Sequence, residues 1–188
     1  MKRDKLKNIL KNTIALTCVA LFSSSSLFSD GLSLKSNDLL GQVSINQVFN
    51  GFGCTGKNIS PQLSWSNTPK NTKSFAITIY DPDAPTGSGW WHWVMFNIPK
   101  DTNQISSNAS QLGLLPKGTV QSKTDFGNTG FGGACPPKGD KAHTYITTIY
   151  ALDVEKINLD KNANPALVGY MINSHMIEKS SIVTYYKR

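Results

Sequence analysis

Alternation of hydrophobic and polar residues along the chain predicts a protein built mainly from β-strands. The clearest strand reads KSFAITIY, where Phe75, Ile77 and Ile79 share one face because successive side chains of a strand point to opposite sides. Residues 90–98 are nearly all apolar or aromatic, which indicates a strand that is buried on both faces. The predicted strands cover residues 41–49, 73–80, 90–98, 144–152 and 182–186.

One amphipathic helix is predicted near the C-terminus. Asn164 can accept a hydrogen bond from the first turn as N-cap, and Pro165 suits the first helical position. The residues that follow place one set of side chains on a shared helix face, at the spacing i, i+3, i+4, i+7. This predicted face consists of Leu167, Tyr170, Met171 and Ser174.

The order of these elements indicates a single, mainly β domain. Many strands with few helices favour two antiparallel sheets packed face to face, with the C-terminal helix and short peripheral helices beside them. The chain has 188 residues, of which 39% are hydrophobic, and this suits one domain with a sizeable core. About 45 residues rich in Gly, Pro, Ser and Asn separate the strands at 90–98 and 144–152, and loops of this length usually carry function.

The first 29 residues have the features of a secretory signal peptide. A basic start is followed by an apolar stretch at 13–22 and a run of serines at 23–26, so cleavage is expected near 26–29. The apolar stretch is too short to span a bilayer. A buried amphipathic helix is the alternative. The interpretation predicts a mature domain of residues 30–188 that is exported, either to a periplasm or to the external medium.

The formal net charge of +7 is concentrated in this leader. The first twelve residues hold five Lys or Arg against one Asp, a net charge of +4, which leaves +3 for the rest of the chain. No basic run occurs elsewhere that could follow a phosphate backbone, so nucleic acid is not expected as a partner.

The cysteines also favour export. If Cys18 is removed with the leader, Cys54 and Cys135 remain as an even pair in an oxidising compartment, where a disulfide is expected. Such a bridge would stabilise the fold by roughly 4 kcal/mol in the chain-entropy view. Two separate buried thiols are the alternative.

Three segments carry polar groups that a plain core would not need. DPDAP begins at Asp81, directly after a strand; GWWHWV contains His92; and GGACPPKG precedes His143 and Tyr145. Prolines can hold the carboxylates of the first segment at a strand end, and glycines let backbone N–H groups face an anion. Taken singly, the three segments could be a tight turn, a strand with a core histidine and a plain loop.

In this order and spacing, the three segments together resemble the phosphatidylethanolamine-binding-protein family. The stretch GKNISPQLSW, just after Cys54, points to its bacterial Raf-kinase-inhibitor-like branch, and the resemblance extends over residues 31–188. The family implies two antiparallel sheets with Greek-key connections. It also implies a shallow pocket that binds phosphate, phosphorylated head groups and similar anions.

The resemblance also implies which side chains form the pocket. Three positions depart from the family pattern, since Ala134, Thr144 and Phe131 replace the usual Pro, Arg and Tyr. The implied binding residues are Asp81, His92, His143, Tyr145, Trp90, Ala84, Pro85, Gly133, Cys135 and Pro137. Imidazole N–H groups and a tyrosine hydroxyl can donate to phosphate oxygens, and Asp81 can fix a histidine tautomer.

These residues predict a binding protein for a small anionic ligand, with no cofactor. An inhibitor or interaction protein that acts on an extracellular protease or another partner is the first alternative, and a homodimer stays open. The second alternative is a metal-dependent enzyme that uses Asp81, His92 and His143 as two histidines and one carboxylate. No catalytic motif supports an enzyme, since the tripeptide DFG at 125–127 occurs without the other kinase motifs.

Overall fold

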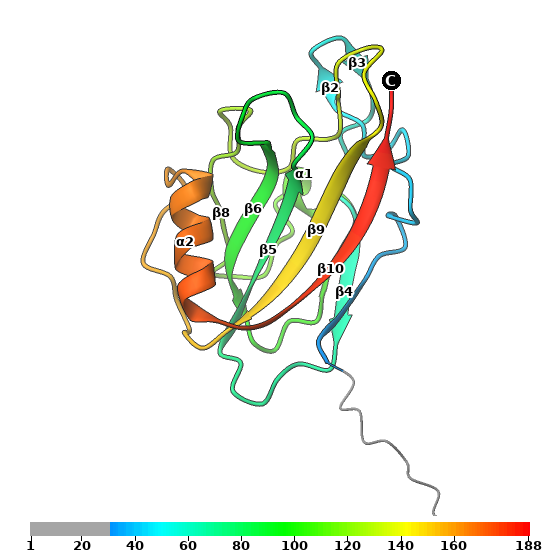
Figure 1. Ribbon diagram of the computed structural model, residues 1–188. Helices are drawn as coiled ribbons and strands as arrows, with labels where there is room; N and C mark the ends of the chain where they lie inside the picture. Colours follow the sequence, from blue (N-terminus) through cyan, green and yellow to red (C-terminus); the bar gives the residue numbers. More distant parts are fainter. Residues whose placement is uncertain (1–30) are drawn as a thin grey trace, which may run out of the picture.

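The computed structural model describes residues 31–188, and the predicted signal peptide and Cys18 lie outside these residues. Its elements, in chain order, are β1 (Ser33–Lys35), β2 (Asn50–Gly51), β3 (Cys54–Thr55), β4 (Leu63–Ser66), β5 (Ser74–Asp81), β6 (Trp90–Pro99), β7 (Gln104–Ile105), α1 (Ala109–Leu112), β8 (Val120–Gln121), β9 (His143–Leu152), α2 (Pro165–His175) and β10 (Met176–Tyr186) (Figure 1). No helix in the described part of the chain is long and apolar enough to cross a membrane.

Two antiparallel sheets form the body of the protein. The larger has the strand order β10-β9-β5-β6-β8, and the smaller has the order β1-β4-β7. Strand β9 returns to lie beside β5 after β6 and β8 have been laid down on the other side, which is the spatial order of a Greek key. The prediction of a mainly β, antiparallel fold is therefore confirmed.

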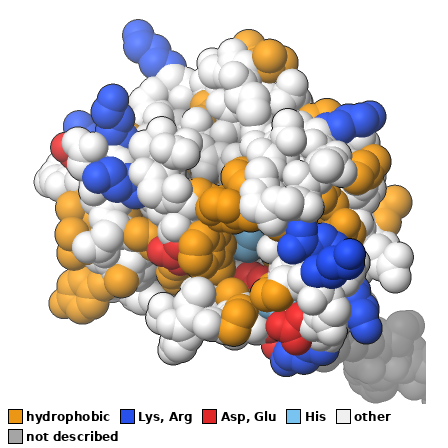
Figure 2. All heavy atoms as spheres, turned by 90° about the horizontal axis from the view of Figure 1, so that it is seen from above, with side chains coloured by type: hydrophobic (Ala, Val, Ile, Leu, Met, Phe, Trp, Pro, Cys, Tyr) orange, Lys and Arg blue, Asp and Glu red, His pale blue; other side chains and the backbone are white. Residues whose placement is uncertain are grey.

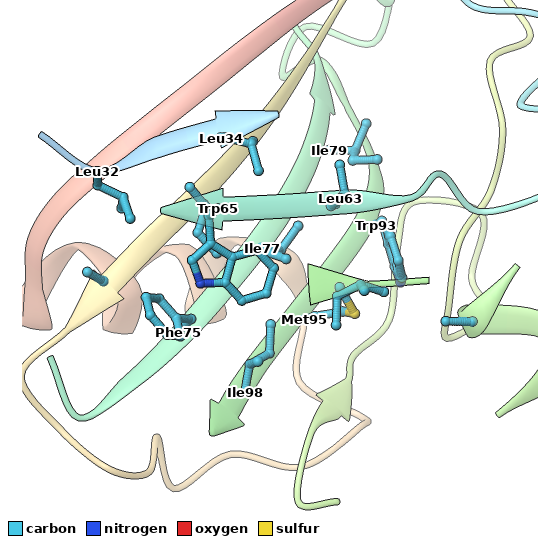
Figure 3. Close-up of a cluster of buried hydrophobic side chains, with 14 of the residues drawn as sticks. Leu32, Leu34, Leu63, Trp65, Phe75, Ile77, Ile79, Trp93, Met95 and Ile98 are labelled. Carbon is cyan, nitrogen blue, oxygen red and sulfur yellow. The ribbon is translucent and has the colours of Figure 1, made fainter. Parts of the chain in front are cut away.

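The main core lies between these two sheets. Phe75 and Ile77 of β5 pack with Trp65 of β4 in one cluster of buried side chains, and Figure 3 shows these residues from the two sheets facing each other. Phe75 and Ile77 are fully buried, and Ile79 is nearly so. The alternation read from KSFAITIY therefore gives the correct inward face of β5.

Helix α2 covers the other face of the large sheet. Its N-cap is as predicted, since the Asn164 side chain accepts a hydrogen bond of 2.8 Å from the backbone N–H of Leu167. The predicted buried face is wrong, because Tyr170 is 68% exposed. Pro165, Val168 and Ile172 face the sheet instead. These three residues also follow helical spacing, so the helix carries two apolar stripes, and only the position of the sheet decides which one is buried.

The strand predicted at 41–49 is not formed. This segment makes only two isolated bridges, from Gln42 to Tyr185 and from Val48 to Ala134. Between them the backbone turns, and the Ser44 carbonyl accepts a hydrogen bond of 3.0 Å from the Gln47 N–H. Serine and asparagine side chains favour such local bonds over a strand ladder. The strand predicted at 182–186 is real but longer, since β10 starts directly after α2.

Candidate functional site

Three strand ends meet at one edge of the large sheet. Strand β5 ends at Asp81, which pairs with Trp90 at the start of β6, and β9 begins beside β5 at His143. Because neighbouring strands are antiparallel, the end of β5 lies next to the beginnings of both partners. Figure 2 looks onto this edge and shows a hollow with histidine and acidic side chains at its bottom and hydrophobic side chains around it.

Asp81 and His143 form a buried pair. The Asp81 Oδ2 atom lies 2.7 Å from His143 Nδ1, and both side chains are almost fully inaccessible to solvent. The other carboxylate oxygen, Oδ1, accepts hydrogen bonds from the backbone N–H groups of Asp83 at 2.8 Å and Ala84 at 3.1 Å. The turn of the DPDAP segment therefore holds the Asp81 carboxylate in one orientation.

The environment of His143 favours its charged form. Burial acts to lower its pKa, but the hydrogen bonds to the carboxylates of Asp81 and Asp140 outweigh burial and raise the pKa above the usual value. The second contact joins His143 Nε2 to Asp140 Oδ2 at 3.3 Å. His143 therefore lies between two carboxylates that favour its protonated form.

His92 has a different environment and a different state. Its Nδ1 atom lies 2.8 Å from the carbonyl oxygen of Gly132, which can only accept, so Nδ1 carries the hydrogen. Burial lowers the pKa of His92, against the effects of the Gly132 carbonyl and of the Asp81 charge. His92 is therefore a neutral imidazole at neutral pH.

Tyr145 supplies a polar group that the protein leaves without a partner. The residue is 3% exposed, and its hydroxyl makes no hydrogen bond within residues 31–188. Burial, followed by the negative charge of Asp81, raises the pKa of the phenol. The hydroxyl therefore remains protonated and can donate a hydrogen bond.

These side chains surround a cavity of about 170 Å³. Nine of the ten residues implied by the family resemblance line it, and the exception is Gly133. Four further lining residues were not predicted. The complete lining consists of Phe52, Asp81, Ala84, Pro85, Thr86, Trp90, His92, Phe126, Cys135, Pro136, Pro137, His143 and Tyr145.

Gly133 does not offer its backbone to the cavity, contrary to the prediction. Its N–H donates to the Asn58 side chain at 2.7 Å, and the neighbouring N–H of Ala134 donates to the Gln47 carbonyl at 3.0 Å. The glycine is needed for packing instead, because a Cβ atom at this position would lie 2.3 Å from the backbone oxygen of Gln47. A glycine-rich sequence cannot show which of these two uses applies.

Phe126 is the most informative residue that the sequence reasoning missed. Its ring meets those of Trp90 and His92 edge to face, at centroid distances of 5.3 and 5.4 Å. The exposed Phe52 ring stacks on it at 5.8 Å. Phe126 therefore forms one wall of the cavity. An aromatic residue in an otherwise polar loop is the signal in the sequence that indicates such a wall.

The predicted disulfide is present and forms part of the same wall. Cys54 and Cys135 have an S–S distance of 2.07 Å and a Cα–Cα distance of 6.0 Å. The bridge ties the β2–β3 hairpin, whose turn contains Phe52, to the segment that supplies Cys135 to the cavity lining. Two walls that are far apart in sequence are thus covalently joined.

Asp83 fastens the DPDAP turn to the start of β9. One carboxylate oxygen lies 2.6 Å from Lys141 Nζ, and the other accepts the backbone N–H of Thr144 at 2.9 Å. The hydrogen bond to Lys141, followed by those to Thr144, lowers the pKa of Asp83 to about 2. Asp83 therefore stays ionised above acidic pH and holds Asp81 and His143 in register.

The metal-dependent alternative gains no support from this arrangement. Asp81 and His143 are bonded to each other, and His92 Nδ1 is bonded to backbone. In residues 31–188, no group of three or more His, Cys, Asp or Glu side chains is placed to hold a metal ion. The arrangement can instead form hydrogen bonds to a small polar ligand in a mostly apolar surround.

Comparison with known proteins places this site in a family context. The family model described as "Phosphatidylethanolamine-binding protein" matches residues 40–187. The chain is 47% identical over 179 residues to the UPF0098 protein YbcL of Escherichia coli K12, covering 93% of this chain and 98% of YbcL. It is 48% identical over 158 residues to the UPF0098 protein YbhB of the same organism, covering 82% of this chain and 99% of YbhB.

Solved structures agree in fold. The crystal structure of E. coli YbcL, described as a new member of the mammalian PEBP family, superposes with a TM-score of 0.81 at 50% identity, covering 84% of this chain and 98% of that one. The structure of a putative PEBP homologue from Chlamydia trachomatis, CT736, superposes with a TM-score of 0.70 at 24% identity, covering 84% of this chain and 98% of CT736. At this identity the match shows the shared fold alone.

Proposed function

Because the chain belongs to the phosphatidylethanolamine-binding protein family, we propose that it is an exported protein that binds a small anionic ligand, such as phosphate or a phosphorylated head group, in the cavity at the sheet edge. The ligand would lie among Asp81, His92, His143 and Tyr145, with its uncharged part against the aromatic and proline side chains of the wall. Such a cavity, mostly apolar with a few convergent polar groups, is typical of small-molecule sites.

The observation that carries this proposal is the cavity itself, which brings the polar side chains of Asp81, His92, His143 and Tyr145 together within a mostly apolar wall. Buried polar groups are nearly always hydrogen-bonded, and a donor left unpaired costs about 1–3 kcal/mol. Tyr145 is buried, lines the cavity and has no partner in the described chain. The neighbouring groups cover this hydroxyl, so a ligand oxygen would reach it only after a shift of the cavity lining. His143 lies on the same cavity, and the carboxylates of Asp81 and Asp140 favour its protonated form.

Binding without covalent chemistry fits the rest of the lining. Cys135 is consumed in the disulfide, and the hydroxyl of Thr86 donates to the backbone carbonyl of Gly89. Neither group is available as a nucleophile with an adjacent base. Export is supported by the disulfide between Cys54 and Cys135, which suits an oxidising compartment, and by the composition of residues 1–29.

A histidine-resolved NMR titration with inorganic phosphate tests the proposal. We expect saturable shifts at His92 and His143 in the wild-type protein, and loss of binding in His92→Ala and His143→Ala.

Tyr145→Phe should retain the fold and weaken binding by about 3- to 10-fold, the worth of one hydrogen bond. His175→Ala is the matched control, since His175 lies at the far end of α2 and contacts Asp153. Wild-type affinity in both pocket histidine variants would refute the site.

A further inference from the structure

We propose that His92 makes the pocket selective for oxyanions that carry a hydrogen of their own, such as a phosphate monoester in its singly protonated form. Oxyanions of equal charge that lack this hydrogen would be rejected. The inference rests on the proposed function, because such selectivity requires that the pocket binds anions. It adds that His92 acts as an acceptor toward the ligand.

The Gly132 carbonyl fixes the tautomer of His92. A neutral imidazole has one N–H, and the contact of 2.8 Å between Nδ1 and the carbonyl oxygen uses it. The Nε2 atom therefore carries a lone pair. Because Nδ1 is used by Gly132, which is not part of the cavity lining, Nε2 is the ring nitrogen that His92 has left for a ligand. A ligand there encounters an acceptor.

The surroundings of His92 keep it neutral. Two carboxylates act on its ring, those of Asp81 at the end of β5 and of Asp125 in the loop before Gly132. Two aromatic rings, those of Phe126 and Tyr145, meet the His92 ring edge to face. The charges of Asp81 and Asp125 favour protonation, but burial of the ring opposes it more strongly. An oxyanion that presents only lone pairs would therefore meet the lone pair of Nε2, while a P–O–H group would donate to it.

The charge of the pocket leads to the same ligand class. The histidine that is favoured in its protonated form, His143, is already paired with Asp81 and lies near Asp140. The nearby Lys141 is bonded to Asp83, and its side chain is 67% exposed. These pairs leave no surplus positive charge in the site to compensate a dianion. A monoanion with one donor and several acceptor oxygens fits better, since it can donate to His92 and accept from Tyr145.

Methyl phosphate and methyl sulfate provide a matched pair of probes. At about pH 5.5, below the second pKa of about 6 of a phosphate monoester, both are monoanions of similar shape, and only methyl phosphate has an O–H group. Binding of each to the purified protein would be measured by calorimetry. ¹⁵N NMR at the same pH would test whether His92 is the neutral Nδ1–H tautomer, and a protonated ring would overturn the inference. We expect methyl phosphate to bind about 10- to 100-fold more tightly, since methyl sulfate leaves the His92 acceptor unpaired.

Two variants connect this preference to His92. His92→Phe keeps a ring of similar shape and removes the acceptor, so the two probes should then bind with similar affinity. His175→Phe should keep the wild-type preference. Equal binding of both probes to the wild-type protein would overturn the inference while leaving the anion pocket intact. If neither methyl phosphate nor methyl sulfate binds, the proposed function is overturned, and this inference with it.

Discussion

Four polar side chains lie buried at the same sheet edge, and each meets the cost of burial in a different way. Asp81 and His143 neutralise each other as an ion pair, and His92 stays neutral and bonds to backbone. Tyr145 is left with an unpaired hydroxyl. Because buried charge is tolerated only when it is paired, the ion pair also fixes where charge can reside in the site. The two histidines of the cavity consequently have pKa values that are shifted in opposite directions, although both are buried.

The pairing of His143 predicts a specific pH dependence. Its folded-state pKa is raised above the value of about 6.5 expected in the unfolded chain. The stabilisation by this pair should therefore be complete below about pH 6.5 and be lost as the pH rises through the folded-state pKa. Asp81→Asn should lower the pKa of His143 and remove this loss from the stability profile. NMR titration and urea unfolding across this pH range measure both effects.

Asp153→Asn serves as the control for this change. It removes the carboxylate that contacts His175, at the opposite end of the sheet, and should leave the pKa of His143 unchanged. An unaltered His143 pKa in Asp81→Asn would show that Asp81 does not raise this pKa, and would contradict the predicted pH dependence.

At the residue scale, the sequence could supply candidates but not their partners. Asp81 and His143 are separated by 62 positions, and no local pattern links them, so the family resemblance was needed to bring them together. The roles of Asp83 and Asp140 were missed because a carboxylate in a polar loop gives no signal of its partner. Which histidine is charged follows from burial and neighbours, and these exist only in the folded chain.

At the element scale, the segment with Gly132 and Gly133 is a packing device. It lies against residues 47–49, where the Ala134 carbonyl accepts the N–H of Phe49 at 3.0 Å. A Cβ at Gly133 would come within 3.0 Å of three backbone atoms of this neighbouring segment. The close approach positions the Gly132 carbonyl that orients His92, so the packing of two irregular segments controls the chemistry of the pocket.

Replacing this glycine should therefore cost stability. Gly133→Ala must displace backbone on one side or the other, and we expect a loss of about 1–3 kcal/mol in the free energy of unfolding, as for other overpacked sites. Gly169→Ala is the matched control, because Gly169 lies within α2 with nothing inside 4 Å of the added carbon. This second change should stabilise the protein by roughly 1 kcal/mol through helix propensity. Urea denaturation compares the two, and equal effects would contradict the packing role.

The elements differ in how far they could be predicted. Strands β5, β6 and β9 and the start of α2 were predictable because each combines a strong hydrophobic pattern with clear end signals. The segment at 41–49 has strand-like alternation, but the Ser44 side chain bonds locally to the Asn46 N–H and the Gln47 side chain, and the backbone turns. The buried face of α2 depended on the location of the sheet, which local spacing does not contain.

At the scale of the whole molecule, the site depends on contacts between distant parts of the chain. The sheet supplies the bottom of the cavity, the segment from Phe126 to Pro137 supplies one side, and the hairpin with Phe52 supplies the rim. The disulfide is the covalent link between the last two. Cys54 and Cys135 are 81 positions apart, so the bridge restricts a large loop in the unfolded chain.

This geometry leads to a prediction that connects stability with export. Closing a loop of this length should contribute roughly 4 kcal/mol, so the variant Cys54→Ser/Cys135→Ser should lose about that much in urea unfolding. The full chain expressed in a Gram-negative host should reach the periplasm and show no free Cys54 or Cys135 thiol on alkylation. The same chain without residues 1–29 should stay in the cytoplasm with both thiols reactive after unfolding, and with the lower stability of the double variant.

The two halves of this experiment separate export from folding. Oxidised cysteines in the leaderless cytoplasmic protein would show that the bridge forms without export, and the disulfide would then no longer support the proposed localisation. A leaderless, reduced protein as stable as the exported one would contradict the stabilising role instead. Under the proposal, the Phe52 hairpin reaches its place on the cavity rim by folding, and oxidation after export then holds it there.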